Sequence, residues 1–169
     1  MGTILFVTGP ARSGKSRWAV TRAREWGPDV VFVATCRPGD PEMDDRIDRH
    51  RSERPYWRTI EAPGSVGAAL ASILPPPSGV VLDCVTLWMS DRLDSTDDQI
   101  QAEWGEELGA LRRAAWPAVI VGNEVGWAPV PDSVLLRRFR DLNGWLGQRT
   151  AEAADEAWLL VAGRPLRIK

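Results

Sequence analysis

The sequence predicts an α/β fold in which helices flank a mainly parallel β-sheet. Short runs that are apolar at every position alternate with longer amphipathic stretches. Runs of this kind are typical of strands that helices cover on both faces. A glycine-rich loop also stands between the first apolar run and the first amphipathic stretch. Strand, loop and helix in this order favour an α/β domain over an all-helical or all-strand fold.

The N-terminal elements follow one another closely. Thr3–Thr8 is predicted to be a buried strand, and Lys15–Trp26 a helix with Trp18, Ala19 and Ala23 near one face. Val30–Thr35 is predicted to be the second buried strand.

Two segments then interrupt the alternation. The segment 37–58 is highly charged and proline-containing, and its middle, Glu42–Arg51, is compatible with a short helix. The stretch Leu74–Gly79 is a proline-rich connector that ends a helix.

The C-terminal half returns to the α/β pattern. Three further strands are predicted there, and between the first two of them apolar residues at helical spacing predict one long helix over Asp97–Ala115. The three strands are Val80–Asp83, Ala118–Gly122 and Ala157–Val161.

The composition limits the classes of protein to which this chain can belong. The 169 residues, 44% of them hydrophobic, suit one domain spanning 1–169. The net charge of −2 argues against a broad basic surface for DNA or RNA, and no stretch has the apolar length of a membrane span. The N-terminus lacks the features of a secretion signal, and Cys36 and Cys84 form no metal-binding spacing, so we expect a cytoplasmic protein. The nine tryptophans are predicted to pack in the core or in subunit contacts.

The glycine-rich loop carries the strongest chemical signal. It matches G-x-x-x-x-G-K-[ST], and its Lys15 is one of only two lysines in the chain. Backbone N–H groups of such a loop point at phosphate oxygens, and the following helix adds its positive dipole end. We therefore predict a P-loop NTPase-like fold and a nucleotide triphosphate site; a chance glycine-rich turn is the alternative. The predicted phosphate-binding residues are Gly9, Pro10, Ala11, Arg12, Ser13, Gly14, Lys15 and Ser16.

A magnesium site is predicted beside this loop. Lys15 would contact the β- and γ-phosphates, and the hydroxyl of Ser16 would bind Mg²⁺. Asp83 ends an apolar strand, where the carboxyl ends of parallel strands form the nucleotide crevice, and is predicted as the second metal-site residue. The alternative is a solvated aspartate at a strand end. The chain lacks a lysine for a guanine-reading Asn/Thr-Lys-x-Asp motif, which favours a transferase over a switch GTPase.

His50, the only histidine, admits two interpretations. Among alternating charges it is most simply a side chain on a solvated helix face. Its neighbours Arg46, Arg49, Arg51 and Arg54 nevertheless suit phosphate, and a neutral imidazole could attack an α-phosphorus to form a phosphoramidate. Spacing alone does not decide between the two.

The chain resembles the bifunctional adenosylcobinamide kinase / adenosylcobinamide-phosphate guanylyltransferase family of cobalamin assembly. The resemblance covers nearly the whole chain and rests on the P-loop together with two more specific motifs, Met43-x-x-Arg46-Ile47-x-x-His50 and Asn123-Glu124-Val125-Gly126. Further matches are Val33-Ala34-Thr35, Trp57-x-Thr59-x-Glu61-x-Pro63, Asp83-Cys84-x-Thr86-Leu87-Trp88, Arg138-Phe139-Arg140-Asp141 and Gly163-Arg164-Pro165. The chain departs from the family pattern at Pro10, Ala128-Pro129 and Gly147.

The resemblance implies two reactions at Mg²⁺-dependent sites. ATP or GTP phosphorylates adenosylcobinamide, and GTP then guanylylates His50, which passes GMP to adenosylcobinamide phosphate to give adenosylcobinamide-GDP. It also implies a homo-oligomer. Besides the P-loop, the implied nucleotide-contact positions are Ala34, Thr35, Cys36, Ser52, Glu53, Arg54, Glu61 and Asp83. A monofunctional P-loop kinase and a nucleotide-binding interaction protein without turnover remain as alternatives.

Overall fold

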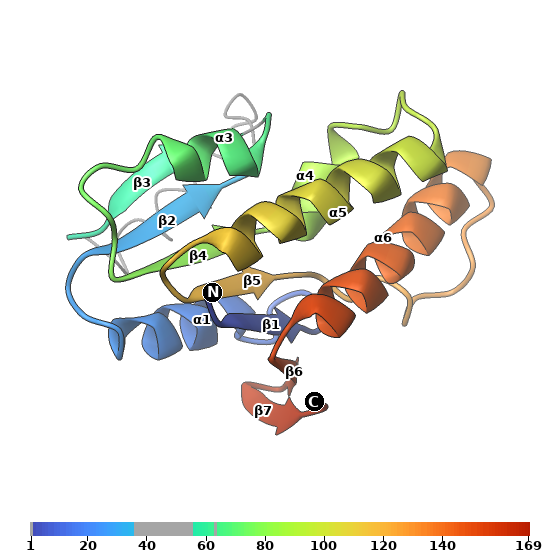
Figure 1. The fold of residues 1–169 in the computed structure, drawn as a ribbon. Helices are drawn as coiled ribbons and strands as arrows, with labels where there is room; N and C mark the ends of the chain where they lie inside the picture. The colour runs from blue at the N-terminus through green and yellow to red at the C-terminus, as the bar shows by residue number, and fades with distance from the viewer. Residues whose placement is uncertain (1, 36–55, 63) are drawn as a thin grey trace.

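One seven-stranded sheet organises the molecule (Figure 1). The computed structural model describes residues 2–35, 56–62 and 64–169. The strand order is β3-β2-β4-β5-β1-β6-β7, and every pairing is parallel except that of β7 with β6. The mainly parallel α/β prediction is therefore confirmed. The strands are β1 Ile4–Thr8, β2 Val30–Ala34, β3 Arg58–Glu61, β4 Gly79–Asp83, β5 Ala118–Val121, β6 Glu156–Val161 and β7 Arg164–Arg167.

Helices cover both faces of the sheet. Buried residues of α1 pack with one set of strand side chains, and buried residues of the remaining helices pack with the other set. Two apolar layers result, with the sheet between them, as the uninterrupted apolar strands predict. The described helices are α1 Lys15–Arg24, α3 Val66–Ala71, α4 Val85–Ser90, α5 Asp97–Arg113 and α6 Val134–Ala153.

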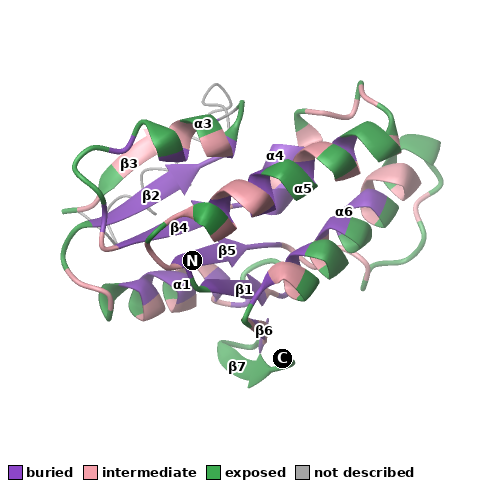
Figure 2. Ribbon diagram, viewed as in Figure 1, coloured by how far each residue is buried: buried purple, intermediate pink, exposed green. Residues whose placement is uncertain are grey.

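Burial is concentrated in the central strands. Figure 2 shows β2, β4, β5 and β1 as buried, whereas β7 at the sheet edge is exposed along its length. Seven of the nine tryptophans pack in or against the two apolar layers, as predicted. Trp127 and Trp145 are the exceptions, with exposed fractions of 59% and 42%.

Helix ends depend on local signals. In α5, Thr96 accepts a hydrogen bond from the backbone of Gln99, and the side chain of Gln99 accepts one from the backbone of Thr96. This reciprocal capping box satisfies N–H groups that the first turn leaves unpaired. The helix therefore begins where the sequence predicts, and it ends at Arg113, two residues earlier than expected.

Four elements were not predicted as such from the sequence. They are β3, α4, α6 and β7. In α6 only Leu142, Asn143, Leu146 and Thr150 are buried, while the apolar residues of its first turn are exposed. The possible helix over Glu42–Arg51 lies outside the described residues. Within the described part of the chain, no helix is both long and apolar enough to cross a membrane.

Candidate nucleotide and metal site

The strand registers bring the predicted site residues to one edge of the sheet. Ala34 of β2 pairs with Glu61 of β3 on one side and with Asp83 of β4 on the other. Asp83 in turn pairs with Val121 of β5, which pairs with Val7 of β1. One row therefore crosses five strands at their carboxyl ends, and the predicted phosphate loop begins two residues beyond Val7. This edge is where parallel α/β sheets bind ligands.

The loop after β1 curls in a way that needs glycine. Gly9 has φ of 150°, and a Cβ there would stand 2.3 Å from the carbonyl oxygen of Leu160. Gly14 has φ of 97° and forms the N-cap of α1, which begins at Lys15. Both backbone conformations suit glycine far better than other residues. The predicted strand–loop–helix context is thus confirmed.

Lys15 and Ser13 occupy the interior of the loop. The side chain of Lys15, in a residue only 6% exposed, donates a hydrogen bond from Nζ to the carbonyl oxygen of Pro10 at 2.7 Å. The hydroxyl of Ser13 is buried and has no hydrogen-bond partner among the described residues. Buried polar atoms are normally paired, so this orphan hydroxyl is what a loop built for a phosphate oxygen would leave. Pro10, Ala11 and Arg12 are more open to solvent.

Ser16 and Asp83 meet across the crevice. The Ser16 hydroxyl donates to Oδ2 of Asp83 at 3.2 Å, although the two residues belong to α1 and β4. Hydroxyl and carboxylate oxygens are the hard ligands that Mg²⁺ prefers, and Mg²⁺ takes its remaining ligands from water and substrate phosphates. The pair therefore fits the predicted metal. The structure groups no three His, Cys, Asp or Glu residues as a metal cluster in the part that it describes.

Thr35 has a positioning role that the sequence did not indicate. It is fully buried, and its hydroxyl donates to the carbonyl oxygen of Cys84 at 2.7 Å and accepts from the N–H of Cys84 at 2.9 Å. The backbone N–H of Thr35 also donates to the carbonyl oxygen of Asp83 at 3.1 Å. These three bonds fix the chain on both sides of the Asp83–Cys84 peptide, and with it the place from which the Asp83 carboxylate reaches Ser16.

The other predicted site residues either lie apart from Asp83 or fall outside the described residues. Glu61 is exposed at the end of the edge strand β3, two strands from Asp83, or roughly 10 Å at the usual strand spacing. Cys36, His50, Ser52, Glu53 and Arg54 lie outside the described residues, so the structure does not place the predicted nucleophile.

A second polar segment reaches the loop from β5. The backbone N–H of Glu124 donates to the carbonyl oxygen of Gly9 at 2.9 Å, and Gly122 and Asn123 connect it to the end of β5. Neither residue was among the predicted site residues. The sequence signal was present, because Asn123-Glu124 follows an apolar run just as Asp83 does, but strand order was needed to bring it beside the phosphate loop.

Comparisons with known proteins agree with this geometry. The family model described as cobinamide kinase / cobinamide phosphate guanyltransferase matches residues 5–168. The bifunctional adenosylcobalamin biosynthesis protein CobP of Pseudomonas aeruginosa is 39% identical over 96% of this chain and 95% of its own length. The bifunctional adenosylcobalamin biosynthesis proteins CobU of Salmonella typhimurium and Escherichia coli are each 36% identical over 98% of this chain and 99% of their own length. The chain belongs to the cobinamide kinase / cobinamide phosphate guanyltransferase family.

Proposed function

We propose that this chain is a bifunctional transferase of cobalamin assembly that uses its P-loop for two successive reactions. As a kinase it transfers the γ-phosphate of ATP or GTP to adenosylcobinamide. As a guanylyltransferase it transfers GMP from GTP to adenosylcobinamide phosphate and yields adenosylcobinamide-GDP. The single observation that carries the proposal is the P-loop with Ser16 and Asp83 hydrogen bonded beside it, in a chain that matches the bifunctional family along its length.

In the kinase reaction the loop acts by orientation and charge. Backbone N–H groups at the start of α1 and the ammonium of Lys15 would hold the β- and γ-phosphates, with Lys15 leaving the Pro10 carbonyl that it contacts in this structure. Ser16 and Asp83 would hold Mg²⁺ bound to the nucleotide; the ion would neutralise charge on the phosphates. The acceptor hydroxyl oxygen then bonds to the γ-phosphorus as the bond to the bridging oxygen breaks, and a nucleoside diphosphate leaves.

In the guanylyl reaction we assign the nucleophile to His50. One imidazole nitrogen bonds to the α-phosphorus of GTP, and pyrophosphate leaves. A phosphate oxygen of adenosylcobinamide phosphate then attacks the same phosphorus, and the imidazole departs. This assignment rests on the Arg46-Ile47-x-x-His50 motif and the family match, since His50 lies outside the described residues.

Labelled GTP tests the two-step transfer. GTP labelled on the α-phosphate should leave an acid-labile, alkali-stable label on the wild-type protein, whereas label on the γ-phosphate should leave with pyrophosphate. His50→Ala should abolish the adduct and retain binding of nucleoside triphosphate. A wild-type protein that stays unlabelled would refute the guanylyl half and favour the monofunctional kinase.

The phosphate loop has a separate test. Lys15→Ala should weaken or abolish both reactions, because both require the same triphosphate to be held. Full kinase turnover by Lys15→Ala would contradict the assignment of the loop. A wild-type protein that binds nucleotide and forms neither product would instead support an interaction protein without turnover.

Two further expectations accompany the proposal. The family resemblance supports a homo-oligomer, which sedimentation or light scattering of the purified chain would measure. The use of ATP and GTP as substrates favours a cytoplasmic location.

A further inference from the structure

The segment Asn123-Glu124 lies between the two parts of the proposed site. It follows β5, the strand that separates β4, which ends in Asp83, from β1, which leads into the P-loop. The hydrogen bond from the N–H of Glu124 to the carbonyl oxygen of Gly9 fixes this segment to the first residue of the loop. The proposed function uses Asp83, Ser16 and Lys15, but it gives Glu124 no role.

A buried polar clamp holds the residue before Glu124. The N–H of Asn123 donates to Oγ1 of Thr86 at 3.2 Å, and its carbonyl oxygen accepts from Nδ2 of Asn143 at 2.8 Å. Thr86 and Asn143 are themselves joined by a 2.7 Å hydrogen bond, and their exposed fractions are 6% and 7%. Both backbone groups of Asn123 are thus bound by side chains of α4 and α6. Fully paired buried networks of this kind specify one geometry.

The carboxylate of Glu124 retains unused accepting capacity. It is half-buried, and its Oε1 accepts a long hydrogen bond of 3.2 Å from the N–H of Gly126. Its Oε2 has no hydrogen-bond partner among the described residues, although an ionised carboxylate can accept about four hydrogen bonds. Asp83 differs, because its Oδ2 is bound by the Ser16 hydroxyl at the metal pair. The backbone that carries this carboxylate is fixed to the loop, and the open oxygen suits the acceptance of a proton.

We propose that Glu124 is the general base of the kinase reaction. Its carboxylate takes the proton of the acceptor hydroxyl as that oxygen bonds to the γ-phosphorus and the bond to the bridging oxygen breaks. The nucleoside diphosphate leaves with the bonding electron pair, and Glu124 later releases the proton to solvent. The guanylyl reaction needs no such base, because its acceptor is a phosphate oxygen already ionised at neutral pH. The inference rests on the proposed kinase function and assigns one residue to only one of the two reactions.

Glu124→Gln tests the assignment, because it keeps the shape and removes the base. With ATP and adenosylcobinamide, kcat of the kinase should fall by about 100-fold or more. The acidic limb of the wild-type pH profile of kcat should disappear in this variant. Labelling of the variant by α-labelled GTP should continue at the wild-type rate. Its KM for ATP should stay within about threefold of the wild-type value, a change that corresponds to roughly 0.7 kcal/mol of free energy. Glu124→Asp, which keeps the carboxylate, should recover part of kcat and the acidic limb.

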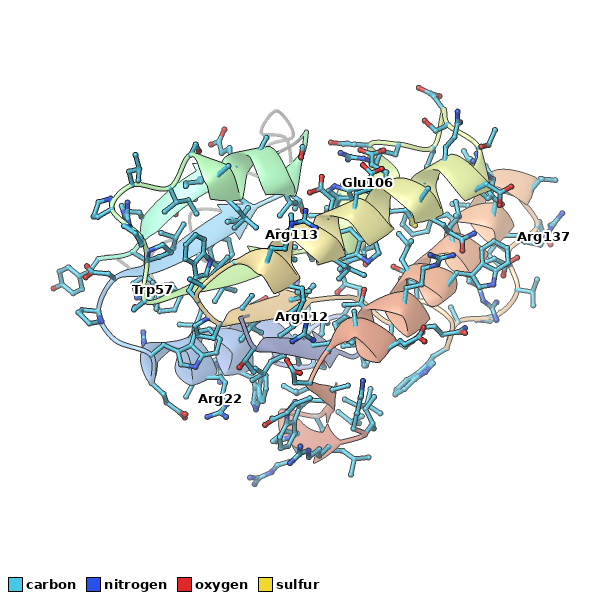
Figure 3. The ribbon with its side chains drawn as sticks, viewed as in Figure 1. Arg22, Trp57, Glu106, Arg112, Arg113 and Arg137 are labelled. Atoms are coloured by element: carbon cyan, nitrogen blue, oxygen red, sulfur yellow. The ribbon has the colours of Figure 1, made fainter. Side chains whose placement is uncertain are left out.

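A matched control and three outcomes complete the test. Glu106, labelled in Figure 3, is an exposed glutamate of α5, and Glu106→Gln should leave the kinase rate and its pH profile unchanged. Wild-type kinase rates in Glu124→Gln would overturn this inference alone. Equal losses of kinase activity and labelling would also overturn it, by showing a structural role. A wild-type chain without kinase activity would overturn the proposed function and this inference together.

Discussion

At the scale of single residues, Asp155 joins three segments that are distant in the sequence. Its Oδ2 accepts from the N–H of Ile4 at 2.8 Å and from the guanidinium of Arg112 at 2.7 Å. Arg112, labelled in Figure 3, reaches from α5 to this point and also donates to the carbonyl oxygen of Ala153 at the end of α6. The hydrogen bond from Arg112, followed by the Ile4 N–H and the charges of Arg112 and Lys169, holds the pKa of Asp155 below its ordinary 3.8 against the opposing effect of burial.

This lowered pKa makes part of the stability depend on pH. A carboxyl whose pKa is depressed by folding contributes stability above its unfolded pKa and loses it as pH falls through the folded value. Asp155→Asn should therefore lower the free energy of unfolding at pH 7. The side chain is 45% exposed, so solvent screening limits the expected loss to about 1 kcal/mol or less. Urea denaturation at pH 7 and again well below pH 3.8 would measure it.

The difference between wild type and Asp155→Asn should shrink at the lower pH, because the wild-type carboxyl is then protonated as well. Asp141→Asn, at an exposed position of α6, serves as the control and should change little at either pH. An equal loss from Asp155→Asn at both pH values would show that the effect comes from shape rather than from charge.

At the scale of elements, the packing of α1 against β4 depends on a glycine, which has no side chain, at the start of β4. Gly79 begins β4, and a Cβ there would stand 2.2 Å from Cε3 of Trp26, which follows α1 and packs against the apolar layer of that helix. The indole ring lies where any larger residue at position 79 would have to be. The beginning of β4 and the end of α1 therefore have complementary shapes that neither segment reveals by itself.

Gly79→Ala should destabilise the protein by about 1–3 kcal/mol, the usual cost of overpacking a core. Trp26→Leu should also destabilise it, but the two changes together should cost less than the sum of their separate effects. Urea denaturation of the wild type, both single variants and the double variant measures this coupling. Additive costs would show that the ring and the glycine do not constrain each other.

Hydrogen bonds between elements also set the position of a helix. The carboxylate of Glu107, on α5, is buried and accepts hydrogen bonds from the N–H groups of Val66 and Gly67 in the first turn of α3. A helix of six residues has little stability of its own, so these bonds and its packing hold it in place. Ser65 caps the helix locally, because its side chain accepts a hydrogen bond from the N–H of Ala68, but the two bonds from Glu107 come from a residue some 40 positions later, and the sequence predicted only that a helix ends at the proline-rich connector.

At the scale of the whole molecule, a bound nucleotide should stabilise the fold. It would bind at the carboxyl ends of the strands, where the loop after β1 lies close to Asp83 at the end of β4. GTP with Mg²⁺ at about 100 times its dissociation constant should add roughly 2.7 kcal/mol of stability. For a domain of this size that corresponds to a rise in Tm of about 5–10 °C. Asp83→Asn should lose the part of the rise that needs Mg²⁺, because Asp83 and Ser16 are the proposed metal ligands.

Thermal unfolding with GTP, in the presence of Mg²⁺ or of a chelator, measures these shifts. Asp141→Asn should behave as the wild type does and controls for the loss of a negative charge. A shift in Tm that is identical with Mg²⁺ and with chelator in the wild type would contradict the proposed metal site.

The local features of this protein follow from short stretches of its sequence. Uninterrupted apolar runs in β1, β2, β4 and β5 predict buried strands, and Gly9 and Gly14 predict a curled loop, because each depends only on neighbouring residues. The Ser16–Asp83 pair was also predictable, since a carboxylate at the end of a parallel strand lies on the same edge as the loop. The family and its two reactions followed from motifs of this local kind.

Which distant segments meet at the site depends on contacts between elements that no single stretch of the sequence shows. The strand order brings Glu124 to Gly9, the buried hydroxyl of Thr35 holds the chain at Cys84, and Asn143 of α6 clamps Asn123. The edge strand β3, which has no buried residue, and the long helix α6, which has only four, likewise depend on their neighbours for their place in the fold. The periodicity of a segment records which face is buried but not what covers that face, because strand order is set by packing across the whole chain.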